Sequence, residues 1–386
     1  MLLENKKVAI IGGGPGGLTL ARLLQLQNVN VKVYERDLNK NARVQGSPLD
    51  LHDESGLAAI RKADLLDEFK NNFLPGADKT LILNERAEIF FNDHEMSREE
   101  NFGDEYFRPE IDRGTLRKIL LESLQPETVV WDSHFISMEV QNEGWTMHFK
   151  NTPSVYADIV IGSDGANSKI RPYITNIKPL YSGITMLEGN VYESKIATPV
   201  IHSLLKGGKI MAFGNSQNLL MGQKGDGALG FYASFKSDEN WANTNGLDYT
   251  DNNQMMEWFK KTYPEWGSIW YELFENASVP FIPRPIYYMP LDQTWESLPD
   301  ITIIGDAAHV MPPFAGEGAN MAMLDALELS EFLTSEKYKT VQEAIYYYEI
   351  NMRERASKAT QESLENGEKM HSKDALKTML AFFNGE

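Results

Sequence analysis

The sequence of 386 residues predicts an α/β fold: a parallel sheet with an inserted, mostly antiparallel β-sheet and a C-terminal helix. Apolar runs at 7–11 and 301–304 lead into Gly12 and into Gly305-Asp306. Such runs, bounded by glycine, are typical of strands covered on both faces. Between residues 173 and 288, short β-type runs alternate with Gly, Asn and Asp turns, which indicates a second sheet.

Composition excludes several classes of function. The chain has 37 Lys+Arg against 55 Asp+Glu, a formal charge of −18, which argues against general nucleic-acid binding and against docking on anionic membranes. It has no cysteine, which excludes disulfides, thiolate metal sites and cysteine nucleophiles. No run approaches the length of a membrane span, and no apolar signal segment precedes the first strand. We therefore expect a cytoplasmic protein with no metal centre.

The first glycine-rich turn has the full context of a dinucleotide-binding fingerprint. Gly12, Gly14 and Gly17 follow a strand and open an apolar helix, and a second strand ends at Glu35. Gly12 allows the tight turn, Gly14 lets the backbone approach a pyrophosphate, and Gly17 lets helix and strand pack closely. The carboxylate of Glu35 can accept hydrogen bonds from a ribose with a free 2′-hydroxyl, which favours NAD or FAD over NADP. The alternative is a glycine-rich βαβ unit with no ligand.

Two further strand ends carry an acidic residue. A buried strand over 157–162 closes at Asp164-Gly165, after which Ser168 and Arg171 are expected to begin a helix, and the strand over 301–304 closes at Asp306. Open α/β sheets bind ligands at the carboxyl ends of their strands. A helix over 319–333, starting near Gly318, directs its partial positive charge at the same crevice.

Several charged residues near this crevice allow two interpretations. Arg43 and Asp50 either lie at its mouth or are solvated loop charges. Asp112 is expected to cap a helix on which Arg113 and Arg117 share a face, where they could bind a phosphate or balance local acids.

The domain organisation follows from these elements. We expect a discontinuous nucleotide-binding domain over 1–172 and 289–335, a substrate-binding domain over 173–288 and a C-terminal helical segment over 336–386. The Met and aromatic residues of the helix expected over 253–262 are assigned to the core in preference to ligand contact.

The three dispersed motifs, in this order and at this spacing, resemble class A flavoprotein monooxygenases, the superfamily of para-hydroxybenzoate hydroxylase. The resemblance covers nearly the whole chain. It implies a Rossmann-like FAD-binding domain interrupted by a substrate-binding sheet, with FAD as cofactor and NADPH or NADH as electron donor. Chemistry is then supplied by the flavin, so no catalytic side chain is expected, and His309 is assigned a structural or flavin-adjacent role in preference to that of a base.

Within the superfamily, residues 305–320, 7–14, 49–52 and 109–117 look most like the tetracycline-inactivating flavin monooxygenases. The resemblance implies cofactor contacts, NADPH included, from Gly12, Gly14, Gly17, Glu35, Arg36, Arg43, Asp50, Arg113, Arg117, Asp164, Asp306, Pro313, Gly316, Gly318, Ala319 and Asn320. It implies substrate contacts from Glu188, Gly230, Tyr232, Phe314, Asn366 and Met370. The chain departs from that group at Glu188, where the family has Gln, and at Gly230, where it has His.

The implied function is hydroxylation of a planar aromatic or enolic polycyclic small molecule, possible candidates including tetracycline-type antibiotics, through a flavin C4a-hydroperoxide formed with O₂. Such an enzyme would confer antibiotic resistance and is expected to work as a monomer. Alternatives are a phenolic hydroxylase of secondary metabolism, a flavin oxidase or reductase on the same scaffold, and a flavoprotein that sequesters a drug without turnover.

Overall fold

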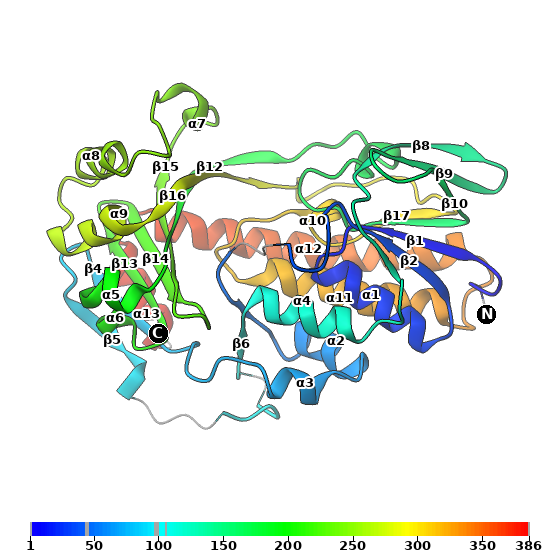
Figure 1. Ribbon diagram of the computed structural model, residues 1–386, viewed down its shortest axis with the longest axis horizontal. Helices are drawn as coiled ribbons and strands as arrows, with labels where there is room; N and C mark the ends of the chain where they lie inside the picture. Colours follow the sequence, from blue (N-terminus) through cyan, green and yellow to red (C-terminus); the bar gives the residue numbers. More distant parts are fainter. Residues whose placement is uncertain (1, 43–45, 96–99, 105, 385–386) are drawn as a thin grey trace.

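The computed structural model describes residues 2–42, 46–95, 100–104 and 106–384. In Figure 1, a parallel sheet with its helices forms one half of the molecule, and a large, mostly antiparallel sheet forms the other. One long helix runs along both halves. The fold class expected from the sequence is confirmed.

The parallel sheet has five strands in the order β17-β11-β1-β2-β7. Every neighbouring pair is parallel, so the carboxyl ends of the strands share one edge. The strands are β1 (Lys7–Ile11), β2 (Asn30–Tyr34), β7 (Val129–Val130), β11 (Ile159–Gly162) and β17 (Ile301–Ile303). Their apolar side chains are almost fully buried in the central strands, as the apolar runs predicted.

Both faces of this sheet are covered, which explains its apolar composition. The helices on one face are α1 (Pro15–Leu26), α2 (Gly56–Lys62), α3 (Leu66–Lys70), α4 (Arg113–Glu122) and α11 (Glu317–Thr334). An antiparallel sheet of β8 (Phe135–Gln141), β9 (Gly144–Phe149) and β10 (Val155–Ala157) covers the other, where Phe149 stacks on Tyr34 at 4.9 Å between ring centroids. A tight turn joins β8 to β9, with Gln141 opposite Gly144.

The second large sheet has seven strands in the order β16-β12-β15-β14-β13-β4-β5. Five come from the inserted region: β12 (Leu180–Val191), β13 (Lys209–Gly214), β14 (Gln217–Gln223), β15 (Leu229–Lys236) and β16 (Ser278–Tyr288). Two come from earlier in the chain, β4 (Thr80–Asn84), which pairs parallel to β13, and β5 (Ile89–Asn92). The sheet therefore extends beyond the segment 173–288, although the expected domain boundaries themselves stay a prediction.

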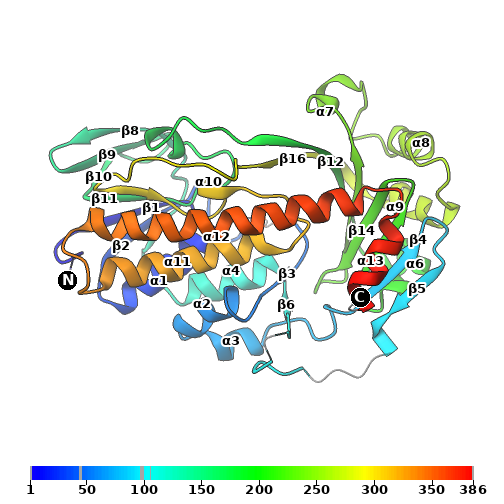
Figure 2. The ribbon, with the colours of Figure 1, turned by 180° about the vertical axis from the view of Figure 1, so that it is seen from behind.

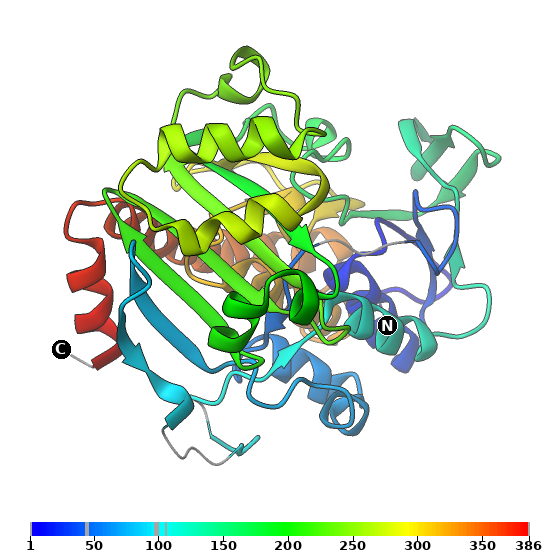
Figure 3. The same ribbon diagram turned by 60° about the vertical axis from the view of Figure 1, so that its left-hand side comes forward.

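The outer face of the seven-stranded sheet carries its own hydrophobic core, and the helices that cover it lie in front of the strands in Figure 3. They include α8 (Asn252–Thr262), whose Met255, Met256, Trp258 and Phe259 are buried, and α9 (Tyr271–Asn276). The assignment of these Met and aromatic residues to the core is confirmed. Short helices complete this half: α5 (Ser194–Ala197), α6 (Pro199–Leu205) and α7 (Trp241–Thr244).

Two C-terminal helices tie the halves together, as Figure 2 shows from behind. The helix α12 (Val341–Met370) packs along α11 and then reaches the seven-stranded sheet, and α13 (Ala375–Asn384) packs on β13 and β4. Two short elements lie between the halves, the strand pair β3 (Leu49–Asp50) and β6 (Glu110–Ile111), and α10 (Asp306–His309).

Local expectations failed at two points. Asp112 precedes α4, but its carboxylate accepts a hydrogen bond from the Gly225 backbone amide, at 3.0 Å, and does not cap the helix. No α-helix begins at Ser168, because the carboxylate of Asp164 holds that hydroxyl at 2.5 Å, and only a single 3₁₀ turn follows at Arg171–Tyr173. In the first case a tertiary contact overrides the local signal, and in the second a competing local hydrogen bond does.

Candidate active site

Three of the predicted motifs meet at one edge of the parallel sheet. Residues Gly12, Ser163 and Ile304 directly follow β1, β11 and β17, and each donates a backbone hydrogen bond to a neighbouring strand. The start of α11 lies against this edge, since a Cβ on Gly305 would come 2.8 Å from the Ala322 side chain. We refer to this edge, where the sequence predicted a ligand site, as the crevice.

The glycine turn leaves room for a ligand at one position. Gly12 has φ +108°, and a Cβ there would lie 2.2 Å from the Ser163 carbonyl oxygen. A Cβ on Gly17 would lie 2.2 Å from the Gly12 carbonyl oxygen, so both residues are needed by the fold itself. A Cβ on Gly14 meets nothing within 4 Å, although Gly14 sits at the N-terminus of α1. That open helix end can receive a phosphate.

The end of β2 carries the acidic group of the fingerprint. Glu35 is 7% exposed, and its carboxylate accepts hydrogen bonds from the backbone amides of Gly13 at 2.5 Å and Asp37 at 2.9 Å. Arg36 is exposed to solvent. Arg117 is buried, pairs with Asp37 at 2.8 Å and lies over Trp131. Arg117 is therefore already engaged by an acid close to the end of β2.

The loop after β11 is bound to the loop after β17 by Arg171, whose side chain is buried. Its Nε donates to the Ala307 carbonyl oxygen at 2.7 Å, and its Nη2 donates to those of Ala166 and Asp306 at 3.0 and 2.9 Å. Sequence reasoning gave Arg171 only a place at a helix start. Its role depends on contacts more than 130 residues away, which no local pattern reveals.

Asp306 and Arg113 carry opposite charges within the crevice. Burial raises the pKa of the Asp306 carboxyl, while the charges of His309, Arg113 and Arg171 act in the opposite direction. Among the described residues no side chain or amide hydrogen-bonds this carboxylate, which leaves it free to accept a hydroxyl donor from a ligand. The Nε of Arg113 donates to the Ser47 carbonyl oxygen at 2.9 Å.

The start of α11 is held by the segment around β3. The Asn320 amide donates to the carbonyl oxygens of Asp50 and Gly316 at 2.9 and 3.2 Å, and its Oδ1 accepts from the His52 backbone amide at 3.0 Å. Gly316 is in the left-handed region, φ +71°, and a Cβ there would lie 3.2 Å from the Asp50 carboxylate. Pro313 is exposed, and Gly318 and Ala319 are partly exposed in the first turn of α11.

His52 was not among the predicted site residues, although it lies in the motif 49–52. It is 2% exposed, with Nε2 3.2 Å from Asp50 Oδ2 and Nδ1 3.2 Å from Glu317 Oε1. Burial alone would lower the pKa of His52, but the contacts with both carboxylates raise it to about 9. Burial would raise the pKa of Asp50, but the His52 hydrogen bond and the charge of Lys209 lower it to about 2. His52 is thus an imidazolium between two carboxylates.

His309 lies inside a second buried network. Its Nε2 is 2.6 Å from Asp325 Oδ2, and Asp325 also accepts from the Gly305 amide at 2.8 Å and from Arg355 at 2.7 Å. Burial favours neutral His309, but the charge and hydrogen bond of Asp325 raise the pKa of His309. Its 1% exposure supports the structural role over that of a base.

Three of the expected substrate residues, Glu188, Gly230 and Tyr232, lie on strands of the seven-stranded sheet, whereas Phe314 precedes α11 and Asn366 and Met370 lie on α12. Ile184 and Met186 of β12 form a small apolar cluster with Ile286, against which Tyr232 and Phe314 pack. Further along β12, Glu188 is 2% exposed and pairs with Arg284 of β16. Gly230 sits close by, where a Cβ would come 3.2 Å from the Lys224 side chain and 3.6 Å from Ser47 Oγ.

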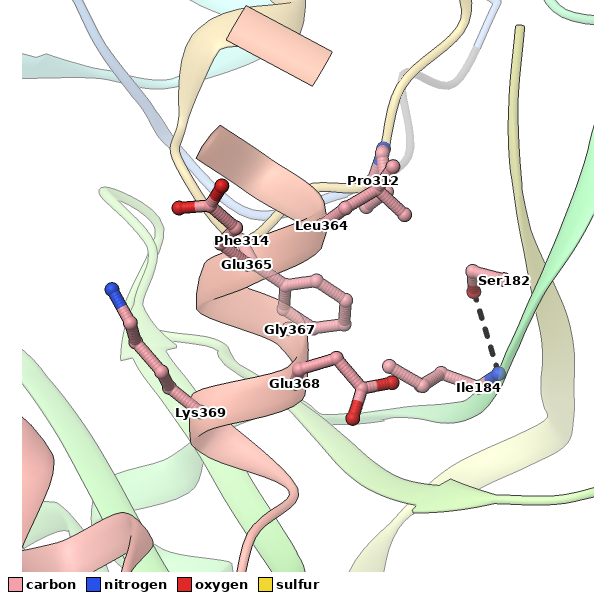
Figure 4. Close-up of a pocket in the computed structure, with 9 residues that line it drawn as sticks. All are labelled: Ser182, Ile184, Pro312, Phe314, Leu364, Glu365, Gly367, Glu368 and Lys369. Carbon is pink, nitrogen blue, oxygen red and sulfur yellow. Dashed lines mark hydrogen bonds between the residues drawn. The ribbon is translucent and has the colours of Figure 1, made fainter. Parts of the chain in front are cut away.

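A pocket of about 490 Å³ opens between β12 and the end of α12, and Figure 4 shows its lining. Its apolar walls are Ile184, Pro312, Phe314 and Leu364. The Phe314 ring lies over Gly367, whose Cβ would come within 2.7 Å of it. The volume is in the range of small-molecule sites.

Of the expected substrate residues, Phe314 lines this pocket, Asn366 lies beside it and donates to the Phe314 carbonyl oxygen at 3.3 Å, and Met370 is 2% exposed in a separate apolar cluster.

The structure therefore gathers most of the predicted residues around one crevice. Arg43 lies outside the described residues. The structure also places near the crevice four features that were not among the predicted site residues: Arg171, His52, Arg284 and the Asp325 network. Asp325 could have been noticed from the sequence, because an acid within the apolar stripe of a buried helix requires a partner. Among the described residues, no group of three His, Asp or Glu side chains could hold a metal ion, and no described helix is long and apolar enough to cross a membrane.

The fold and this crevice define a nucleotide-binding oxidoreductase of the class A flavin monooxygenase type. A family model described as "FAD binding domain" matches residues 5–178 and 299–363, which are the segments that build the parallel sheet and its helices. The chain belongs to this family and is an FAD-dependent monooxygenase.

Similar proteins agree with this assignment. The chain is 28% identical over 379 residues to the monooxygenase asqM of Emericella nidulans, an alignment that spans 85% of this chain and 83% of the relative. Its fold is similar to that of HpxO from Klebsiella pneumoniae, solved with FAD and uric acid (TM-score 0.75, 17% identity, 99% of this chain and 93% of that one). It is also similar to the tetracycline destructase Tet(55) (TM-score 0.77, 16% identity, 100% and 96%). At these identities the two structures bear on the fold alone.

Proposed function

We propose that this enzyme takes electrons from NADPH or NADH and uses O₂ to hydroxylate a planar aromatic or enolic polycyclic small molecule. The observation that carries the proposal is the juxtaposition of two surfaces: the strand ends with Gly14 and Asp306, and a sheet face with both apolar and charged groups. The first surface suits a dinucleotide with a hydroxylated chain, and the second suits a ring system with polar substituents.

The residues that would hold FAD fit its chemistry. The open helix end at Gly14 suits the pyrophosphate, Glu35 the ribose hydroxyls and the Asp306 carboxylate the ribityl hydroxyls. The first turn of α11, with Gly316, Gly318, Ala319 and Asn320, suits an anionic flavin ring edge. Arg36, Arg43, Asp50, Arg113, Arg117, Asp164 and Pro313 complete the proposed cofactor surface. When bound, FAD supplies electron transfer and oxygen activation.

The remaining task of the protein is to exclude water and to orient the substrate. The cluster of Ile184, Met186 and Ile286 offers an apolar surface above the crevice, and Phe314 extends it toward the pocket beside α12. Together with Tyr232, Glu188, Gly230, Asn366 and Met370 these form the proposed substrate region. An apolar cover prevents the activated oxygen from being lost to water before it is transferred.

A tetracycline-type antibiotic is the candidate substrate, which would make the enzyme one of antibiotic resistance. The motifs at 305–320 and 49–52 support it, and so does the size of the pocket beside α12. The departures at Glu188 and Gly230 change the polar groups that face the ring system. Because of these two departures, simple phenols have to be tested as substrates beside the tetracyclines.

The test uses the purified enzyme with FAD, each nicotinamide nucleotide in turn, and labelled O₂. The panel contains tetracyclines and simple phenols, and products are analysed by mass spectrometry. We expect nucleotide consumption that a substrate stimulates, and a product that carries one labelled oxygen atom. Hydrogen peroxide without an oxygenated product would instead identify an oxidase, and an unchanged ligand mass would identify a sequestering protein.

We also propose that the cofactor is held by 1–172 and 289–335 and the substrate by 173–288, with β4 and β5 completing the substrate sheet. The acidic, cysteine-free chain is proposed to work as a cytoplasmic monomer. Its mass in solution and the fraction of the cell that contains it test this part.

A further inference from the structure

The charged pair on the inner face of the seven-stranded sheet is asymmetric. Glu188 and Arg284 lie on neighbouring antiparallel strands, where Arg284 pairs in register with Met186. The Glu188 side chain is 2% exposed, whereas that of Arg284 is 41% exposed. A molecule in the crevice would therefore meet the guanidinium, and the carboxylate would lie beneath it.

The contacts of this pair leave the guanidinium able to bind a second partner. Its Nε donates to Glu188 Oε2, and the other carboxylate oxygen accepts from Asn190 Nδ2 at 3.4 Å. Among the described residues, Glu188 is the sole hydrogen-bond partner found for the Arg284 side chain. The two terminal nitrogens keep their parallel N–H donors, the geometry that binds a carboxylate through two hydrogen bonds.

The surroundings of Arg284 place it beside the proposed substrate. Tyr232, Asp306, Glu188 and Arg284 all interact electrostatically with Arg113, the first residue of α4. Burial lowers the pKa of Arg113, and the charge of Arg284 acts in the same direction. Arg113 thus has the Asp306 carboxylate near it, and Glu188 lies beneath Arg284, so the exposed guanidinium of Arg284 is the group left to meet an anion. An anion bound there would also be attracted by Arg113.

We propose that Arg284, held in place by Glu188, is a specificity-determining residue that binds an ionised oxygen of the substrate, either a carboxylate or a phenolate. This inference rests on the proposed function, since it names the class of substrate for the same crevice. Within the proposed substrate region, Glu188 acts as a positioning residue: its side-chain oxygen accepts the hydrogen bond that orients the guanidinium, and at 2% exposure it lies beneath Arg284.

The experiment measures ligand binding to the FAD-loaded protein through the change in the flavin absorption spectrum. The probes are hydroxybenzoates, their primary carboxamides, which lack the carboxylate, and their methoxy analogues, which cannot form a phenolate. For the wild type, we expect loss of the recognised ionised oxygen to weaken binding by about tenfold to a hundredfold. The series that shows this loss identifies which oxygen Arg284 binds.

The main variant is the double substitution E188Q/R284Q, because R284Q alone would leave Glu188 buried without a counter-charge. We expect the double variant to retain FAD and to bind acids and neutral analogues with equal, weak affinity. The matched control E188Q keeps the guanidinium and a hydrogen-bond acceptor for it, and should keep the preference for the acid. R284K, which keeps the charge but not the paired donors, should show a reduced preference.

Two results would overturn the inference: a wild type without preference for the acid over its neutral analogue, and a double variant with an unchanged preference. The second would mean that the pair only links β12 to β16. These outcomes are separate from failure of the proposed function, which would appear as a protein that binds no flavin or forms no oxygenated product.

Discussion

Replacing Gly14 by alanine should separate what the cofactor needs from what the fold needs. Gly14 has φ −78° and ψ −179°, an extended conformation open to any residue, and a Cβ there meets nothing within 4 Å. Alanine is a poorer helix N-cap than glycine, which costs up to about 1 kcal/mol, but it also restricts the unfolded chain, which returns about 0.4–1 kcal/mol. The stability of the flavin-free protein should therefore change by less than about 1 kcal/mol.

The affinity for FAD should change far more. A methyl group at Gly14 would stand at the open end of α1, where a pyrophosphate has to approach the backbone amides. Losing one or two hydrogen bonds to a charged group, at about 1.5–3 kcal/mol each, raises the Kd for FAD by at least about tenfold. Urea denaturation of the flavin-free protein and titration with FAD, followed by flavin fluorescence, measure the two quantities separately.

The matched control is G12A. Its Cβ would collide with the Ser163 carbonyl oxygen at 2.2 Å, and the backbone φ of +108° is unsuited to alanine. G12A should therefore lower the stability of the flavin-free protein itself, by about 2–4 kcal/mol. If G14A binds FAD as tightly as the wild type does, the phosphate does not lie at this helix end, and the proposed cofactor placement is wrong.

Three further predictions concern residues that hold the crevice together. The pKa of His52 in the folded protein is about 9, against an ordinary 6.5. The stability that protonated His52 adds to the folded state is therefore complete below pH 6.5 and is lost as the pH rises to about 9. In urea denaturation, the wild type should lose on the order of 3 kcal/mol of stability between those pH values, and H52Q should not show this loss. The same pH dependence of stability in both proteins would contradict this prediction. R171Q should lower stability by about 2–4 kcal/mol and speed the loss of FAD in dilution experiments, because one buried and two partly buried carbonyl groups lose their donor. Unchanged FAD release would count against the link between the two loops. D325N should cost about 3–5 kcal/mol in thermal denaturation. E328Q changes the other carboxylate that pairs with Arg355; the Glu328 side chain is 26% exposed, and its change should cost about 1 kcal/mol or less. Similar losses in the two variants would show that burial of the network is not the reason.

The parts of the fold that sequence reasoning predicted are those whose signals are local. A strand, three spaced glycines, a helix and an acid fall within residues 7–35, and this turn has the geometry that those residues require. The strand end at Asp306 and the helix after it are similarly encoded, with α11 beginning at Glu317. Local chemistry is sufficient here because each residue is constrained by neighbours within a few positions.

The parts that were missed depend on partners far along the chain. The apolar run of β4 indicates a strand, but nothing in it states that it pairs in parallel with β13, more than 120 residues later. Arg171 and Asp325 are positioned by hydrogen bonds to the loop after β17, which lies 136 and 20 residues away from them in the sequence. Asp112 shows the same effect in reverse, because a good local cap signal is overridden by the distant Gly225 amide.

This difference also explains why the cofactor is easier to assign than the substrate. Several of the residues proposed for FAD, such as Glu35, Asp164 and Asp306, follow strand ends, whose positions are set by the parallel register of the sheet. The proposed substrate face is set by the antiparallel register of β12, in which Ile184, Met186 and Glu188 turn away from the outer core, where Leu187 and Val191 pack. Since successive residues of a strand face opposite sides, a change at any of the three inward positions alters the substrate surface without disturbing the outer core. Substitutions on this face can thus change the substrate while the fold and the FAD site stay the same. We expect the charge of Arg284 to have the largest effect on substrate preference.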